Sequence, residues 1–377
     1  MSLATIAREN VGHLQSLMDG HFDVLALTDY ESFEQLVFTP IMDMSIPRLV
    51  LVPQTGDPHL VCQAIGYEQL LEETHLPATN VHAYYPYDVS AGGDDGPTFE
   101  QAVDDALSDG STGRVGVDHD HATVADVETV RRTVSTDTAD CSDFLRTVFQ
   151  RRRPEEVELI RRAAEVAEAG VEAALDAVEP GTTEYELASV AERTMTAMGA
   201  RARPYDLHVT SGSHSLHPVR RLSRKPIEAG DSLVLDFLPK VDHYFGDIAR
   251  TTVVGADPTA EQRELQEVVL AALERVESEL RPGIRASEVD AVLREFLARE
   301  GYDGDCITHT GHAIGNDWGP RITSADDTEL TAGMVVAVEP GLYVEGVGGV
   351  RIEDAFLLTD GGAESLMSLP RDPLDLP

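Results

Sequence analysis

Two stretches of the chain, AGDSLVLDFLPKVDHYFGDIART (229–251) and AGMVVAVEPGLYVEGVGGVRIED (332–354), share one layout. Each contains a glycine, Gly230 or Gly333, followed by an apolar run that is typical of a strand. A carboxylate stands six residues after each glycine, and a second carboxylate follows beyond a turn. The four acids are, in order, Asp236, Asp247, Glu339 and Glu353. The sequence therefore carries the same strand-and-acid unit twice.

The duplication extends upstream of both stretches. Pro180-Gly181 and Pro282-Gly283 stand 102 residues apart, and further matches occur at the same offset. Each half is expected to contain a helix, a Pro-Gly break, a second helix and then the acid-bearing strands. A repeat with only two copies indicates one domain with pseudo-twofold symmetry and not a solenoid. Chance similarity between two amphipathic helices is the alternative.

The length and cysteine content set the broad class of protein. The 377 residues are enough for two or three domains of about 150 residues each. No apolar run approaches the ~20 residues of a membrane span, and the N-terminus lacks the pattern of a signal peptide. The three scattered cysteines, Cys62, Cys141 and Cys306, form neither a disulfide framework nor a thiolate metal site. We expect a cytoplasmic protein without a membrane partner.

The charge is strongly negative, with 67 acidic residues against 29 basic ones and a net charge of −38. Only Lys225 and Lys240 are lysines. Such a field repels nucleic acid and anionic membranes, which excludes nucleic acid as a partner. Scarce lysine with abundant Asp, Glu and Arg resembles the proteins of salt-accumulating halophiles, so we expect a halophilic protein that needs high salt. An acidic mesophilic protein is the alternative.

Two domains of different class are expected along the chain. Residues 1–145 alternate helical and strand patterns, which predicts an α/β N-terminal domain without a metal, phosphate or nucleophile motif. Its expected elements are a helix over 13–18, strands over 22–28, 47–54 and 113–118, and a loop over 88–99. The boundary is expected between 142 and 153, and an α+β domain over 150–377.

The helices of the second domain have clear start and stop signals. Pro154 suits the first turn of a helix that Pro180-Gly181 ends. Capping-box patterns at Thr183 and Thr259 begin the next two predicted helices. These signals place the acids of the duplicated unit on strands between helices.

Acids inside apolar strands are costly unless they are paired or bound to metal. A strand, a tight turn and a returning antiparallel strand would bring Asp236 and Asp247 together. A backbone donor or an arginine usually satisfies a single buried acid, whereas four acids in repeated frames favour metal. The segment THTGHAIG (308–315) between the repeats adds His312. The sequence therefore predicts a metal site.

The charges of this ligand set suit two divalent cations, because four carboxylates neutralise four positive charges. Oxygen ligands with one imidazole fit manganese, which we expect first, as well as cobalt, zinc or iron. Two neighbouring cations that share a water lower its pKa toward neutrality and stabilise a developing oxyanion. The expected chemistry is hydrolysis.

The order Asp…Asp…GH.IG…EPG.Y…RIED over 150–377 resembles the pita-bread metallopeptidase family, which includes methionine aminopeptidase, aminopeptidase P and prolidase. The α/β region before it is similar to the N-terminal domain of the creatinase, prolidase and aminopeptidase P branch. This resemblance implies that Asp247 and Glu353 bridge two metals. It places Asp236 on one metal, and His312 and Glu339 on the other. It also implies catalytic roles for Arg351, which would orient ligands or a substrate carboxylate, and for Glu339 as a proton shuttle.

The resemblance is less direct for the histidines that contact substrate. Family members place one shortly before the first metal aspartate, where this chain has His217 and His214, nineteen and twenty-two residues before Asp236. We favour His217 as catalytic, and a solvated loop histidine is the alternative. His309 is a weaker candidate. The family's second histidine, seven residues after the ligand histidine, is replaced by Gly319, beside Asp317 and Trp318.

The leading interpretation is an Xaa-Pro dipeptidase or an aminopeptidase P-like enzyme that acts on small peptides, with a homodimer as the expected assembly. One alternative is a hydrolase or lyase of a small non-peptide solute, similar to creatinase or ectoine hydrolase. Creatinase works without metal, so five intact ligand residues argue against its mechanism. Another is a metal-free binding protein of the same fold, although such relatives lose ligand residues and this chain keeps all five.

Overall fold

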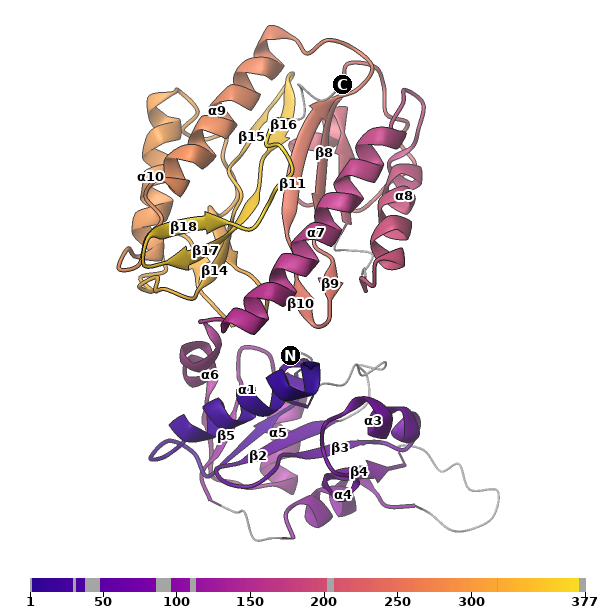
Figure 1. The fold of residues 1–377 in the computed structure, drawn as a ribbon, viewed down its shortest axis with the longest axis vertical. Coiled ribbons are helices and arrows are strands. Elements are labelled where there is room, and N and C mark those ends of the chain that lie inside the picture. The colour runs from indigo at the N-terminus through magenta and orange to yellow at the C-terminus, as the bar shows by residue number, and fades with distance from the viewer. Residues whose placement is uncertain are drawn as a thin grey trace. The chain divides into compact units, whose positions relative to one another are not determined.

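The computed structural model describes residues 2–29, 32–37, 48–85, 96–108, 113–201, 207–316 and 318–372. The chain forms two compact units, Met1–Phe149 and Gln150–Pro377 (Figure 1). Most of the loop expected over 88–99 lies outside the described residues, and so does Asp317. Among the described helices, none combines the length and the apolar character needed to cross a membrane.

The first unit is built on a six-stranded sheet in the order β4-β3-β2-β1-β5-β6. Strands β1 and β5 are parallel, as are β5 and β6 and β3 and β4, whereas β2 is antiparallel to both of its neighbours. The strands are β1 (Val24–Leu27), β2 (Leu49–Pro53), β3 (His59–Gln63), β4 (Val81–Tyr84), β5 (Val115–Val117) and β6 (Thr138–Asp140). The helices are α1 (Leu3–Leu17), α3 (Tyr67–Glu73), α4 (Phe99–Ala106), α5 (Val124–Thr133) and α6 (Ser142–Phe149), with short turns Phe33–Val37 and Ala78–Asn80.

This mixed sheet confirms the α/β class expected for the N-terminal region. The strands predicted over 22–28, 47–54 and 113–118 contain β1, β2 and β5. The helix predicted over 13–18 is the end of the longer α1, which begins at the cap of Ser2. Strands β3, β4 and β6 escaped prediction because polar residues such as His59, His82 and Thr138 interrupt their apolar pattern.

The second unit has two helix pairs, α7 (Pro154–Ala177) with α8 (Glu184–Ala197), and α9 (Ala260–Glu277) with α10 (Ala286–Arg299). Helix α7 begins at Pro154, as predicted. The capping boxes of Thr183 and Thr259 are both formed, since each threonine hydroxyl accepts the backbone N–H three residues later at 3.2 Å. The hydroxyl therefore satisfies a donor that the first turn would otherwise leave unpaired.

The strands of the second unit form two sheets and two hairpins. One sheet has the order β11-β8-β7 and the other the order β13-β12-β14-β17-β18, all antiparallel. Their strands are β7 (Leu207–Ser211), β8 (Ser232–Phe237), β11 (Ile248–Val253), β12 (Gly311–Ala313), β13 (Arg321–Ile322), β14 (Val335–Val338), β17 (Asp354–Thr359) and β18 (Gly362–Ser365). The hairpins are β9–β10 (Lys240–Val241, Tyr244–Phe245) and β15–β16 (Gly341–Val344, Gly348–Arg351), and a 3-10 turn spans Gly212–Leu216.

The two halves repeat one arrangement, which confirms the predicted pseudo-twofold repeat. In the first half α7 and α8 pack beside β7, β8 and β11, and in the second α9 and α10 lie on the side of β14, β16 and β17 (Figure 1). Each half has its own apolar core, one containing Val171, Leu187 and Leu235. The other contains Val269 and Val336. The acid-bearing strands of the two halves, β8 and β11 in one and β14 and β17 in the other, therefore belong to the same unit.

Two local details differ from the expected strands. The turn between Asp236 and Asp247 contains the hairpin β9–β10, and Asp242 takes a positive φ of 48° at its tip. Glu353 was expected inside a strand, but β16 ends at Arg351 and β17 begins at Asp354. Glu353 instead lies in the step between them, where its backbone N–H donates to the carbonyl of Ala249 at 3.0 Å. This bond joins the two halves beside the site.

Candidate metal centre

Four buried carboxylates lie where the two halves of the second unit meet, and we call them the acid cluster. Asp236 lies in β8 opposite Ala249 of β11, and Asp247 directly precedes β11. Glu339 directly follows β14, and the isolated bridge to Ala249 holds Glu353. The exposed fractions are 3% for Asp236, 0% for Asp247, 5% for Glu339 and 2% for Glu353.

Buried contacts fix the backbone on which these acids stand. Gly246 precedes Asp247 where a Cβ atom would lie 2.4 Å from the backbone of Ala163 in α7, so only glycine allows this approach. Arg250 is fully buried and donates from Nη1 to the carbonyl of Glu353 at 2.7 Å. Its Nη2 forms an ion pair with Asp354 at 2.8 Å. Both halves therefore hold the acid cluster rigidly.

His312 lies in β12 and points its Nε2 atom at the acid cluster. Gly311, before it, has no space for a side chain, because a Cβ would lie 2.0 Å from the carbonyl oxygen of Ala337. The Nδ1 atom of His312 contacts the carbonyl oxygen of Ala313 at 2.9 Å. A carbonyl only accepts, so Nδ1 carries the hydrogen and Nε2 keeps its lone pair. That Nε2 lies 3.3 Å from Asp247 Oδ2 and 3.6 Å from Glu339 Oε1.

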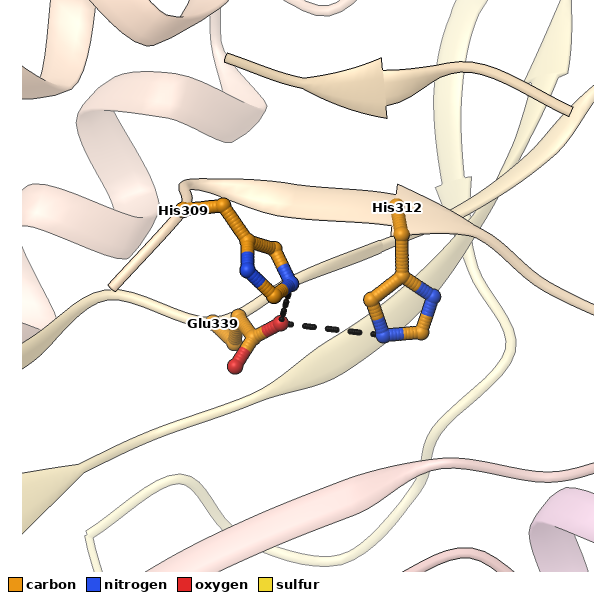
Figure 2. Close-up of side chains that lie close together, drawn as sticks. All are labelled: His309, His312 and Glu339. Carbon is orange, nitrogen blue, oxygen red and sulfur yellow. Dashed lines mark ion pairs between the residues drawn. The ribbon is translucent and has the colours of Figure 1, made fainter. Parts of the chain in front are cut away.

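His309 stands beside His312 on the segment that leads into β12. Its Nε2 atom lies 2.8 Å from Glu339 Oε1, so both imidazoles converge on one carboxylate oxygen (Figure 2). Potential ligand atoms form two groups, and within each group all the atoms lie within 4.8 Å of one another. One group is His309, His312 and Glu339, and the other is Asp247, His312 and Glu353.

Several buried atoms of this site have no aligned hydrogen-bond partner among the described residues. They are Oδ1 of Asp236, both carboxylate oxygens of Asp247, Oε1 of Glu353 and Nε2 of His309. A buried polar atom without a partner costs roughly 1–3 kcal/mol, and more if it is charged. Atoms that can all bind a cation therefore converge without donors to satisfy them, and the residues fit a divalent metal site.

Burial and neighbouring charges shift the pKa values of three acids of the cluster, Asp247, Glu339 and Glu353. Burial, followed by the charges of neighbouring acids, raises the pKa of Asp247 and of Glu353 well above the usual carboxyl range. Burial also acts to raise the pKa of Glu339, but contacts with His309, Arg351 and His312 outweigh it and lower that pKa. Of these three acids, Glu339 is therefore the one whose surroundings favour the ionised form.

Arg351 lies under the acid cluster and is 4% exposed. Its Nη1 donates to Oδ2 of Asp236, and its Nη2 lies 3.5 Å from Oε2 of Glu339. The guanidinium also stacks over the ring of Tyr343, 6.0 Å from the centroid. Arg351 therefore holds one oxygen of each of two acids and leaves Oδ1 of Asp236 and Oε1 of Glu339 facing elsewhere.

The two upstream histidines occupy different surroundings. His217 follows the turn Gly212–Leu216, and its side chain is exposed. The Nδ1 of His214 contacts the buried carboxylate of Glu184 at 3.0 Å, and its Nε2 contacts Arg220 at 3.1 Å. His214 is thus held in a network with Glu184 and Arg220. From the sequence alone, His309 is the weakest of the three candidates. The one feature that could have pointed to it is its position, three residues before the predicted ligand His312.

The position of the missing histidine is closely packed. A Cβ atom on Gly319 would lie 2.1 Å from the Cβ of Ala313, the residue after His312. Trp318 beside it is 1% exposed, and its backbone N–H donates to Oδ1 of Asn316 at 3.0 Å. Since the Cβ of alanine cannot rotate away, no side chain fits at Gly319 unless the backbone moves.

Comparison with known proteins agrees with this geometry. The model of metallopeptidase family M24 matches residues 158–360, which is more than half of the chain and contains all four members of the acid cluster. The chain belongs to this family. The expected pita-bread fold is thereby confirmed, as is the mixed N-terminal domain that accompanies it in the structural neighbours.

Two curated relatives are similar to part of this chain. The chain is 41% identical over 224 residues to the Xaa-Pro dipeptidase of Pyrococcus furiosus, covering 58% of this chain and 64% of the relative. It is 37% identical over 234 residues to the Xaa-Pro dipeptidase of Pyrococcus horikoshii, covering 61% and 66%. The match therefore spans less than two thirds of either relative.

Solved structures resemble the chain over nearly its whole length. The prolidase from Pyrococcus horikoshii has a TM-score of 0.82 at 28% identity and covers 96% of this chain and 99% of its own. The X-Pro aminopeptidase from Thermotoga maritima has a TM-score of 0.83 at 25% identity and covers 96% and 98%.

Proposed function

We propose that this M24 member is a hydrolase that depends on divalent metal and cleaves Xaa-Pro dipeptides, or short peptides with an Xaa-Pro bond. The observation that carries the proposal is the acid cluster itself. Four of its carboxylate oxygens, Oδ1 of Asp236, both of Asp247 and Oε1 of Glu353, are buried near an oriented imidazole and have no aligned donor among the described residues. The relatives named Xaa-Pro dipeptidase support the substrate class.

Five residues would hold two cations, with Asp247 and Glu353 proposed to bridge them. Asp236 would bind one cation, and His312 and Glu339 the other. Manganese is the metal we propose first, and cobalt, zinc and iron suit the same ligand types. When bound, the pair supplies an activated water and stabilises the oxyanion of the tetrahedral intermediate.

The chain's own residues would position the reaction and move its proton. The lowered pKa of Glu339 keeps its carboxylate ionised, so it can accept a proton from the attacking water and return it to the leaving amine. Arg351 would keep Asp236 and Glu339 oriented through its two contacts. We also propose that His217, whose side chain is exposed, contacts the substrate.

A panel of substrates tests this function. Xaa-Pro dipeptides, longer Xaa-Pro peptides and small cyclic amides would be assayed in molar salt with manganese. We expect the dipeptides to be cleaved, and Asp247→Asn to lose at least ~10²-fold in rate, as removal of one transition-state contact does. Val124→Ala, a change at a side chain that is 77% exposed, is the control. Cleavage that Asp247→Asn leaves unchanged would contradict the proposal.

The contact between Gly319 and Ala313 favours a second candidate, a hydrolase of a small non-peptide amide. No side chain at position 319 can contact a scissile bond, so general Xaa-Pro cleavage would be weak. Gly319→His alone is expected to destabilise the fold by about 1–3 kcal/mol, because it overpacks against Ala313. The double change Gly319→His with Ala313→Gly removes this clash and is expected to raise Xaa-Pro turnover.

Kinetics and thermal melts of the two variants separate the candidates. If the double variant does not cleave dipeptides faster than wild type, position 319 is unimportant. The first candidate, the Xaa-Pro dipeptidase, would then stand. Fast cleavage of a cyclic amide with slow dipeptide cleavage would favour the second. Ala313→Gly alone is the matched control, since it opens the same space without adding an imidazole.

We further propose that 1–145 and 150–377 are separate N-terminal and catalytic domains, and that the protein is a cytoplasmic homodimer. The division of the chain into compact units at residues 149 and 150 supports the first statement. Light scattering on the purified protein in molar salt tests the assembly, and a monomer mass would contradict it.

A further inference from the structure

The contact between His309 and Glu339 has the distance of a hydrogen bond but not its alignment. The Nε2 of His309 lies 2.8 Å from Oε1 of Glu339. The same Nε2 is buried and makes no aligned hydrogen bond with any described residue. His312 approaches the same oxygen at 3.6 Å from another direction. The ring centroids of the two histidines lie 5.6 Å apart with the rings tilted by 58°, so the imidazoles converge without stacking (Figure 2).

Such an arrangement is expected of atoms that share a cation. Ligand atoms about 2.0–2.2 Å from one ion lie roughly 2.8–3.6 Å apart, whether the geometry is octahedral or tetrahedral. The distances of 2.8 Å and 3.6 Å to Glu339 Oε1 fall at the two ends of this range. Because an imidazole N–H aimed at a carboxylate would show hydrogen-bond alignment, the poor alignment favours a lone pair directed at a common third partner.

We propose that His309 is a sixth protein ligand, which joins His312 and Glu339, beside the bridging Asp247 and Glu353, on one of the two cations. The inference rests on the proposed function, because it concerns one of the two cations required there. The other cation would be held by carboxylates, mainly Asp236, Asp247 and Glu353. The two positions therefore differ in chemistry, one rich in nitrogen and the other in oxygen.

This difference predicts unequal metal preference. Imidazole ligands suit zinc, cobalt and iron, whereas carboxylates suit manganese. The position with His309 is expected to bind Co²⁺ or Zn²⁺ more tightly than Mn²⁺. Losing one of its protein ligands should weaken that position by at least ~10-fold, since even the outer contacts of ligands contribute 10–100-fold.

Cobalt binding to metal-free protein tests the role of His309. Wild type, His309→Ala and His309→Gln would be dialysed against chelator in molar potassium chloride and titrated with Co²⁺. Stoichiometry comes from elemental mass spectrometry, dissociation constants from chelator competition, and ligand number from the visible absorption of bound Co²⁺. Ile307→Ala is the control, because Ile307 lies on the same segment and is 63% exposed.

We expect wild type and Ile307→Ala to bind two cations, and both His309 variants to bind one of them at least 10-fold more weakly with altered absorption. Wild-type affinities and spectra in both variants would show that His309 is not a ligand, while the proposed function would survive. No cation uptake by wild type would overturn the proposed function and this inference together. Thermal melts of the metal-free proteins check folding, and His309→Gln gives the result if His309→Ala does not fold.

Discussion

Acidic residues have opposite energetic consequences in the acid cluster and on the surface. On the surface, Asp143 is 95% exposed beside Arg146, and Glu295 is 67% exposed beside Arg299. Water and dissolved ions screen these charges, so each pair contributes little. In the acid cluster, burial raises the pKa of Asp247 and leaves its oxygens without aligned donors among the described residues. Burial thus separates the acids that solvent can screen from those that we propose a divalent cation neutralises.

The basic residues also differ between the surface and the acid cluster. Both lysines of the chain are held by fixed contacts: Lys225 pairs with Asp231 at 2.6 Å, and Lys240 is 3% exposed with Nζ 4.4 Å from the ring centroid of Phe245. Arginines supply the cation of exposed pairs such as Arg132–Glu100 and Arg299–Glu295. Within the acid cluster, Arg351 is the one arginine that forms an ion pair with a described member. We propose that metal neutralises the negative charge that Arg351 leaves there.

The largest expected effect comes from removing one acid at the proposed bridge. Glu353→Ala should leave at most one weakly held metal and lower the rate by at least ~10²–10³-fold, because the remaining oxygens cannot hold two cations in place. Elemental mass spectrometry and kinetics in manganese measure both. Glu345→Ala is the matched control, since Glu345 is an exposed acid in the turn of the β15–β16 hairpin. Two retained cations with normal turnover would show that Glu353 is not a ligand.

The next effect is a dependence of stability on pH that appears only without metal. Burial and neighbouring charges raise the pKa of Asp247 and Glu353 in the folded chain. The stability they contribute is complete below the unfolded carboxyl pKa of about 4 and is lost as pH rises through the raised values. Bound manganese would keep Asp247 and Glu353 ionised, so the loaded protein would not lose this stability as pH rises. The gap in Tm between manganese-loaded and chelated protein should therefore widen with pH.

Melts from pH 5 to 8 at constant molar salt measure this gap. The loaded protein carries the same surface charge as the chelated one, so the difference isolates the acid cluster. A loss of 1 kcal/mol lowers Tm by about 2–4 °C for a domain of this size. A gap that stays constant with pH would mean that Asp247 and Glu353 are not the groups that titrate.

Much of the fold was predictable because the same helix and strand patterns occur in both halves of the second unit. Pro154, Thr183 and Thr259 have local reasons to start helices, and the acid-bearing strands follow the same apolar pattern in both halves. The step at Glu353 was not predictable, because the residues around it read as a continuous strand and only the bond to Ala249 interrupts it. Short strands such as β6 depend on neighbours far along the chain.

The acids of the site could be identified from their cost in apolar strands, but their surroundings could not. His309 lacks a strand pattern, and only the packing of β12 against β14 brings it near Glu339. Likewise, the contact of Gly319 with Ala313 arises from a turn that the sequence does not specify. Ligand types are thus visible in the sequence, whereas contacts between loop residues require the folded chain.

The smallest effect per residue, but one spread over the whole surface, is the response to salt. At a net charge of −38, dilution lengthens the screening distance from about 3 Å at 1 M to about 10 Å at 0.1 M, so exposed acids repel one another over longer range. We expect Tm to fall steadily along a potassium chloride series from molar to dilute salt. Saturating manganese throughout keeps the acid cluster filled, so that the fall reports the surface alone. An unchanged Tm would refute halophilic adaptation and leave the acid cluster as the one place where negative charge limits stability.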